Sequence, residues 1–144
     1  MAGLSGGVGG ALVLDCEGIV KLASGDPMTR HRFEAARRRG SLVLTAAPTL
    51  AEVLRGTPRD AGMHRVLNRI TVVPIDKRLG RAAGELLGRA GLSGHQHALD
   101  ALLAVVAMEQ QRPIILLTSD PDDLRRLTHE PDRPARERVA VVRV

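Results

Sequence analysis

The stretch IILLTSDPDDL, at residues 114–124, decides the fold that this sequence predicts. Its first four residues form a short apolar run, which is typical of a strand buried on both faces of a sheet. Ser119, Asp120 and Pro121 then supply the polar cap and first-turn proline with which helices begin. A buried strand that leads directly into a helix is the repeating unit of a parallel α/β sheet.

The same alternation continues along the chain. Short apolar runs occur at residues 11–14, 41–44, 70–75, 114–117 and 139–142. Helices are expected between them at residues 17–23, 27–39, 49–55, 61–69, 77–90, 98–110 and 122–127. This order predicts a parallel sheet covered by helices on both faces.

The chain has 144 residues, which fits a single domain. We expect residues 1–10 to be a flexible lead-in and residues 11–144 to form one domain. The lead-in lacks the basic and apolar regions of a secretory signal, and no apolar run approaches the roughly 20 residues of a membrane span. We therefore expect a cytoplasmic protein with no membrane partner. Cys16 is the only cysteine, which excludes an intrachain disulfide and a cysteine-based zinc framework.

The charge balance favours an anionic partner. Lys and Arg total 21 against 16 acidic residues, and the formal net charge is +5. An excess of this sign is compatible with nucleic acid, which arginine binds through its phosphates. Phe33 is the only aromatic residue, so base stacking on aromatic rings cannot be the main mode of recognition.

Four acidic residues occupy unusual positions. Asp15 and Asp120 each follow a predicted strand at its carboxyl end. If these two strands are neighbours, both carboxylates enter the crevice where open α/β sheets bind ligands. Glu52 and Asp100 interrupt apolar helical stretches, and the helix that carries Asp100 is apolar nearly all round. A carboxylate in such a helix is costly unless it has a partner.

Each of these acids also has a purely structural interpretation. Thr49 and Glu52 have the spacing of a capping box, and Asp100 would lie in the first turn of its helix. Asp120 would cap the following helix, and Asp15 would close a turn. These interpretations do not explain why four acids collect in one small domain. Converging carboxylates repel one another, and Mg²⁺ or Mn²⁺ would relieve that repulsion through oxygen ligands. An acidic crevice on a basic protein is the arrangement that a metal-dependent nuclease needs.

At this point the chain resembles a known family. The stretches LVLD (residues 12–15), TLAEV (49–53), DA (100–101) and TSDPDDL (118–124) are similar to the motifs of PIN domains. Their order and spacing are similar to the VapC toxin branch of that family, over about residues 11–144. The resemblance implies a three-layer α/β/α fold with a central parallel sheet of four or five strands. It also implies a Mg²⁺- or Mn²⁺-dependent endoribonuclease that hydrolyses RNA phosphodiesters with an activated water.

The resemblance also assigns residues and partners. It implies an acidic quartet of Asp15, Glu52, Asp100 and Asp120, with the metal held by Asp15, Asp100, Asp120 and Asp122. Asp123 is the alternative to Asp122 as the auxiliary acid. The implied partners are an RNA substrate, a second copy of the chain in a homodimer, and a cognate antitoxin protein whose segment lies over the active site. The choice of RNA over DNA rests on the resemblance alone.

One departure from the family pattern keeps a second hypothesis open. Many members have Ser or Thr two residues after the first Asp, where this chain has Glu17. The hydroxyl that would orient a ligand or water is therefore missing. Glu17 could add a carboxylate or only cap the next helix. The alternative function is a degenerate PIN module that binds RNA or a protein partner without catalysis.

Histidine and cysteine chemistry provide weaker alternatives. His95 and His97 precede Asp100 and could be metal ligands, although residues after Gly94 are expected to form a loop. A metal-free ribonuclease would need a pair of histidines as general base and acid. The chain has five histidines, but no spacing singles out a pair. Cys16 is expected to be a small buried residue rather than a nucleophile.

Overall fold

The structure is a computed structural model that describes residues 9–144. Most of the predicted lead-in, residues 1–8 of 1–10, lies outside the described residues. Gly10 is buried just before the sheet, and its carbonyl accepts a hydrogen bond from the Leu42 N–H (3.0 Å). Its φ of +70° and its approach to the carbonyl oxygen of Pro113 leave no room for a Cβ, so this position requires glycine. Within residues 9–144 no helix is long and apolar enough to cross a membrane.

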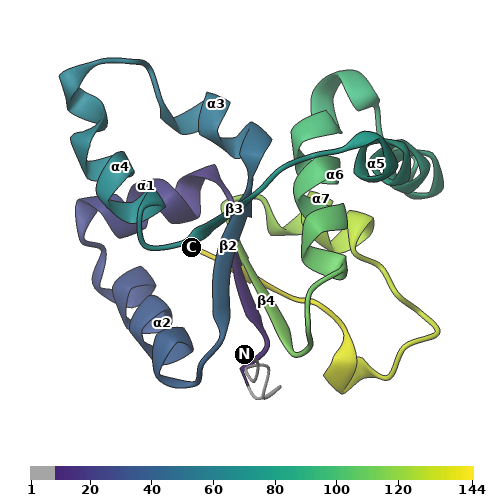
Figure 1. The fold of residues 1–144 in the computed structure, drawn as a ribbon. Coiled ribbons are helices and arrows are strands. Elements are labelled where there is room, and N and C mark those ends of the chain that lie inside the picture. Colours follow the sequence, from purple (N-terminus) through teal and green to yellow (C-terminus); the bar gives the residue numbers. More distant parts are fainter. Residues whose placement is uncertain (1–8) are drawn as a thin grey trace.

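A five-stranded parallel sheet forms the centre of the molecule (Figure 1). Its strands are β1 (Ala11–Leu14), β2 (Leu42–Ala46), β3 (Thr71–Val73), β4 (Ile114–Thr118) and β5 (Ala140–Arg143). The strand order is β3-β2-β1-β4-β5, and every neighbouring pair is parallel. The predicted parallel α/β sheet of four or five strands is therefore confirmed.

Helices cover both faces of the sheet and make the three layers of the predicted fold (Figure 1). On one side lie α1 (Cys16–Ser24), α2 (Pro27–Arg38), α3 (Leu50–Val53) and α4 (Ala61–Leu67), and on the other α5 (Lys77–Ala90), α6 (Gly94–Met108) and α7 (Pro121–Leu127). Short 3-10 helices occupy Ala47–Thr49, Pro58–Asp60 and Ala135–Glu137.

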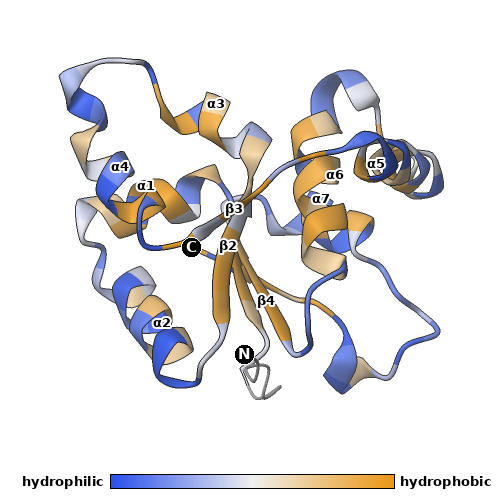
Figure 2. Ribbon diagram, in the orientation of Figure 1, coloured by the Kyte–Doolittle hydropathy of each residue, from blue (hydrophilic) through white to orange (hydrophobic). Residues whose placement is uncertain are grey.

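Two hydrophobic cores follow from the alternation of side chains along the strands. Leu12 and Leu14 of β1 pack with Ile19 and Phe33 on the α1–α4 side. Ala11 and Val13 point the opposite way, into the core under α5, α6 and α7. The strands and most of α6 are strongly hydrophobic, whereas α2 is mixed (Figure 2). Residues 103–107 of α6 are all buried, so the predicted cover on both faces holds for the C-terminal half of the helix. The N-terminal half is more open, and Leu99 is 42% exposed.

The main difference from the predicted elements concerns α6. It begins at Gly94, four residues before the predicted start at Ala98. Ser93 is its N-cap and accepts a hydrogen bond from the His95 N–H (3.2 Å). A serine cap outweighs the low helix propensity of Gly94, so His95 and His97 lie within the helix and not in a preceding loop. Asp100 consequently lies beyond the first turn.

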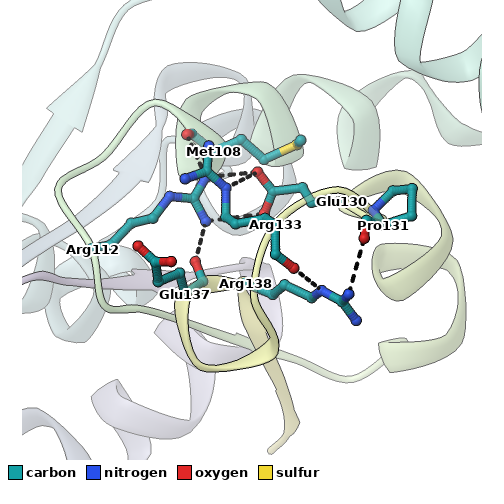
Figure 3. Close-up of polar contacts among 7 residues, drawn as sticks. All are labelled: Met108, Arg112, Glu130, Pro131, Arg133, Glu137 and Arg138. Atoms are coloured by element: carbon teal, nitrogen blue, oxygen red, sulfur yellow. Dashed lines mark hydrogen bonds and ion pairs between the residues drawn. The ribbon is translucent and has the colours of Figure 1, made fainter.

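A network around Arg112 fixes the long connection between α7 and β5 (Figure 3). Both terminal nitrogens of Arg112 donate to the carboxylate of Glu130, at 2.7 and 3.0 Å, and they also reach the carbonyls of Glu137 and Met108. The Arg112 and Glu130 side chains are only 17% and 12% exposed. Residues 128–134 form no helix or strand, and this bidentate ion pair holds them in place instead.

We expect Glu130→Gln to lower the free energy of unfolding by about 2–4 kcal/mol, because it leaves the Arg112 guanidinium mostly buried without its counter-charge. Glu34→Gln is the matched control. Its partner Arg69 lies 3.4 Å away, but the two side chains are 44% and 52% exposed, so a loss below about 1 kcal/mol is expected. Urea unfolding of the two variants measures the difference, and equal losses would contradict it.

Candidate metal centre

The candidate site lies where the order in which the chain adds strands to the sheet changes direction. From β1 the chain moves to β2 and β3 on one side, and later returns to β4 and β5 on the other. Leu14 of β1 is in register with Leu117 of β4, so the residues that follow these strands leave the sheet side by side. Ligands of open α/β sheets bind at such a switch point, beyond the carboxyl ends of the strands. The predicted proximity of the segments that carry Asp15 and Asp120 is therefore confirmed.

Asp15 is held firmly at this edge. It is the N-cap of α1, and its Oδ1 accepts a hydrogen bond from the Gly18 N–H (2.8 Å). Its Oδ2 accepts from the Ser119 N–H (3.1 Å), which joins the start of α1 to the end of β4. The residue is 8% exposed. Each carboxylate oxygen has a second lone pair, so capping leaves Asp15 able to bind a cation.

Asp100 experiences the negative charge of the other acids. Its pKa is raised to about 6, chiefly by burial and then by the charges of Asp120 and Glu52. The structural interpretation of Asp100 as a first-turn residue does not apply, because α6 starts at Gly94. The shift instead indicates that Asp100, Asp120 and Glu52 lie close enough for their charges to interact.

Glu52 and Asp120 are the more exposed acids. Thr49 makes no side-chain cap within the described chain, so the predicted capping box with Glu52 does not form. Asp120 occupies the N-cap position of α7, yet its carboxylate caps no amide of residues 9–144. Its backbone N–H donates to the Thr118 hydroxyl (2.9 Å), which orients the turn. Both carboxylates thus remain open toward the site.

The cysteine beside Asp15 lies close to Glu52. The pKa of the Cys16 thiol is raised to about 12, chiefly by burial and then by the negative charges of Glu52 and Asp15. Glu52 on α3 and Asp15 at the end of β1 therefore both act on one side chain. The expectation that Cys16 is no nucleophile agrees with this environment, since the thiolate is the reactive form.

We expect native Cys16 to react with iodoacetamide at pH 8 at least about tenfold more slowly than free cysteine. Its thiolate fraction falls by about three orders of magnitude when the pKa rises from 9.0 to about 12, and only part of this loss is offset by the greater nucleophilicity of a more basic thiolate. Alkylation followed by mass spectrometry measures the rate. The same protein in urea should react as a free cysteine does, and equal rates in both conditions would contradict the assignment.

A second group of ligand atoms gathers beside Asp100. His97 Nδ1 lies 3.4 Å from Asp123 Oδ2 and 3.8 Å from Asp100 Oδ2. Among residues 9–144, these three residues are the group of His, Cys, Asp and Glu whose ligand atoms all lie within 4.8 Å of one another. The charges of Asp120 and Glu52 also act on Asp100, the member of this group that also belongs to the predicted quartet.

The structure separates the two candidates for the auxiliary acid. The Asp122 side chain is 86% exposed and lies 3.4 Å from Arg125 Nη1, away from the other acids. The Asp123 side chain is 23% exposed and belongs to the group with His97 and Asp100. The sequence could not decide between them, because both follow Pro121 in the first turn of a helix. The sequence predicts a loop at His97, because the apolar pattern of the helix begins only at Ala98, whereas α6 begins at Gly94.

A positively charged side chain, that of Arg143, lies at the edge of the site and was not predicted from the sequence. Arg143 of β5 donates from Nη1 to the carbonyl of Ser119 (3.0 Å), the residue before Asp120. Its place follows from strand pairing, since Arg143 is in register with Thr118 of β4. No local signal distinguishes this arginine from the other 18 in the sequence.

Comparison with known proteins identifies the family. The family model of the PIN domain matches residues 12–130, which contain every acid of the candidate metal centre. The chain belongs to the PIN domain family. The resemblance seen in the sequence is therefore confirmed. No curated relative matches this PIN domain in sequence.

Solved structures of toxin–antitoxin complexes share the fold of this PIN domain. VapBC2 from Rickettsia felis bound to promoter DNA has a TM-score of 0.67 at 16% identity, covering 93% of this chain and 98% of that one. A toxin–antitoxin complex from Klebsiella pneumoniae gives 0.61 at 18% identity, with coverages of 91% and 95%. DNA-bound VapBC from Salmonella typhimurium gives 0.56 at 20% identity, with coverages of 91% and 97%. The similarity extends over nearly the whole of each chain and establishes the fold.

Proposed function

We propose that this PIN domain is a metal-dependent endoribonuclease and the toxin of a type II toxin–antitoxin pair. The observation that carries the proposal is the meeting of acids at the switch point of the sheet. The pKa of Asp100 rises to about 6 through burial and the charges of Asp120 and Glu52, in a chain whose net charge is +5. Membership of a family composed largely of nucleases supports the same conclusion.

The donor set fits a divalent cation. Carboxylate oxygens are the preferred ligands of Mg²⁺ and Mn²⁺, and their mutual repulsion is relieved when a cation binds. Asp15, Asp100 and Asp120 would hold the ion, with Glu52 as a further ligand or as the residue that orients water. Asp123 takes the auxiliary place first given to Asp122, because it lies toward Asp100. When bound, the ion would supply charge neutralisation at the phosphodiester and activation of the attacking water.

The protein's own residues contribute position and charge. Asp15 is fixed by two backbone amides, so it offers a ligand whose orientation is set before any ion or substrate arrives. Glu52 is exposed, so it would be free to accept a hydrogen bond from a water molecule near the phosphate. The net charge of +5 favours binding of the RNA backbone, independently of its bases.

We expect cleavage products with a 5′-phosphate and a 3′-hydroxyl. In the proposed reaction water attacks phosphorus, a new P–O bond forms and the bond to O3′ breaks, so the phosphate stays on the 5′ end of the downstream fragment. Catalysis by a histidine pair would use the 2′-hydroxyl and leave a 2′,3′-cyclic phosphate. End-labelling with and without phosphatase distinguishes the two, and a cyclic phosphate would contradict the proposal.

The toxin assignment draws on the shared fold with VapBC and related complexes. We propose a cognate antitoxin that lies over the active site and a homodimer as the active form, as the family resemblance implies. Co-expression with the protein encoded by the adjacent upstream gene tests the antitoxin: it should co-purify with this chain and suppress cleavage. The cytoplasmic location inferred from the sequence stays a prediction.

A degenerate module that binds without cutting is the second candidate. The observation that favours it is Glu17, which stands in the first turn of α1 where many PIN domains have a hydroxyl. An acid there is also explained by the helix dipole. Calorimetric titration with Mn²⁺ discriminates, because a degenerate module should release no measurable heat of binding, whereas the proposed nuclease should bind the ion.

A further inference from the structure

One imidazole and two carboxylates converge from helices that pack against each other. His97 and Asp100 stand three residues apart on α6, so they share one face of that helix. Asp123 comes from α7, which runs beside α6 on the same side of the sheet (Figure 1). The three side chains are 19%, 33% and 23% exposed, so they are partly ordered by burial and still open to an ion from solvent.

The spacing of the three donors suits a shared metal ion better than direct hydrogen bonds. The separations of 3.4 and 3.8 Å between His97 Nδ1 and the two carboxylate oxygens exceed the usual hydrogen-bond length of about 2.9 Å. An ion with bonds of about 2.1 Å places neighbouring ligands about 3 Å apart and opposite ligands about 4.2 Å apart. The two distances from His97 lie between these values, and all three ligand atoms lie within 4.8 Å of one another. Small rotations about side-chain torsions would therefore bring the three atoms within reach of one ion.

The ligand atoms of His97, Asp100 and Asp123 favour some divalent ions over others. Mg²⁺ takes oxygen ligands almost exclusively, whereas first-row transition metals bind imidazole nitrogen well. We propose that His97, Asp100 and Asp123 bind one divalent ion through an N,O,O set that favours Mn²⁺ over Mg²⁺. Asp100 is the residue that this set shares with Asp15 and Asp120. This inference rests on the proposed function in one respect, namely that a divalent ion binds at this edge of the sheet.

Pulsed electron paramagnetic resonance of Mn²⁺ tests the nitrogen ligand directly. Protein stripped of metal and loaded with one equivalent of Mn²⁺ should show ¹⁴N modulation from a coordinated imidazole. His97→Gln should abolish that modulation and weaken Mn²⁺ binding about tenfold or more in a calorimetric titration. Its Mg²⁺ affinity should change less than about threefold, because oxygen ligands remain.

His95→Gln is the matched control, because His95 is an exposed residue two positions earlier on the same helix. It should retain both the ¹⁴N modulation and the Mn²⁺ affinity. Asp123→Asn should weaken Mn²⁺ binding, whereas Asp122→Asn should not, since Asp122 points toward Arg125. These comparisons separate loss of a ligand from a general change in charge.

Each result bears on the inference separately from RNA cleavage. Mn²⁺ bound with ¹⁴N modulation that depends on His97 supports the nitrogen ligand, even in a protein that cuts no RNA. Mn²⁺ bound without ¹⁴N modulation, or with modulation that survives His97→Gln, overturns it, even if the protein is an active nuclease. In that case His97 only forms surface ion pairs with Asp100 and Asp123.

Discussion

Asp100→Asn is expected to lower RNA cleavage at least about a thousandfold while leaving the fold intact. The carboxylate has the most perturbed environment of the candidate acids, and it belongs both to the predicted quartet and to the group with His97. Loss of a ligand that positions a catalytic ion removes several kcal/mol of transition-state stabilisation, which corresponds to this factor. Initial rates on a structured RNA measure it, with circular dichroism as the check on folding.

The same substitution should make the metal-free protein more stable. The pKa of Asp100 is about 6 in the folded state and 3.8 as a free group, so folding at pH 7 places a charge where it is unfavourable. The difference between these two pKa values corresponds to about 3 kcal/mol, and the 33% exposure of the side chain reduces this cost to about 1–2 kcal/mol. Asn carries no charge and removes this cost.

The cost of the Asp100 charge to the stability of the folded protein depends on pH. The cost is fully present above pH 6, shrinks as Asp100 takes up a proton below pH 6, and is absent below pH 3.8, where the unfolded state is protonated too. In EDTA, the melting temperature of Asp100→Asn should therefore exceed that of the parent protein at pH 7.5, and the difference should vanish near pH 4. A variant that is less stable at pH 7.5, or fully active, contradicts the role given to Asp100.

Asp15→Ala is expected to abolish cleavage too, but with the opposite effect on stability. It removes the acceptor for the Gly18 and Ser119 amides, which cap α1 and join it to the end of β4. We expect the free energy of unfolding to fall by about 2–3 kcal/mol, the sum of a lost N-cap and a second unsatisfied amide. Urea unfolding in EDTA measures the loss.

A matched control shows whether the loss of cleavage and of stability is specific to the Asp15 carboxylate. Asp26→Ala removes a comparable N-cap, whose side chain accepts from the Thr29 N–H at the start of α2, away from the candidate site. It should cost about 1 kcal/mol and leave cleavage unchanged. If Asp15→Ala proved as stable as the parent protein, the tethering role inferred from the two hydrogen bonds would be wrong.

The fold was predictable because its determinants are local. Each strand is a short apolar run, and each following helix has a capping residue or a proline, as at Asp26 with Pro27 and at Asp76. Parallel pairing then requires helices on both faces. The sequence also placed Asp15 and Asp120 at one edge, because the carboxyl ends of parallel strands coincide.

Packing between helices was not predictable in the same way. Which of Asp122 and Asp123 turns toward α6 depends on the rotation of α7 about its axis, and neither residue carries a signal of that rotation. The place of His97 depended on the start of α6, where the Ser93 cap extends the helix through a glycine and two histidines. Arg143 reaches Ser119 only through the pairing of β4 with β5, a contact between residues 24 positions apart.

A cleavage assay on structured RNA, with protein freed of any antitoxin, tests the metal-dependent nuclease most directly. Parallel lanes contain Mn²⁺, Mg²⁺ or EDTA, and the parent protein is compared with Asp100→Asn and with Asp122→Asn, whose side chain lies outside the acid group. We expect cleavage that requires a divalent ion, disappears in Asp100→Asn and persists in Asp122→Asn. Cleavage in EDTA, or equal cleavage by Asp100→Asn, would contradict a metal-dependent nuclease built on these carboxylates.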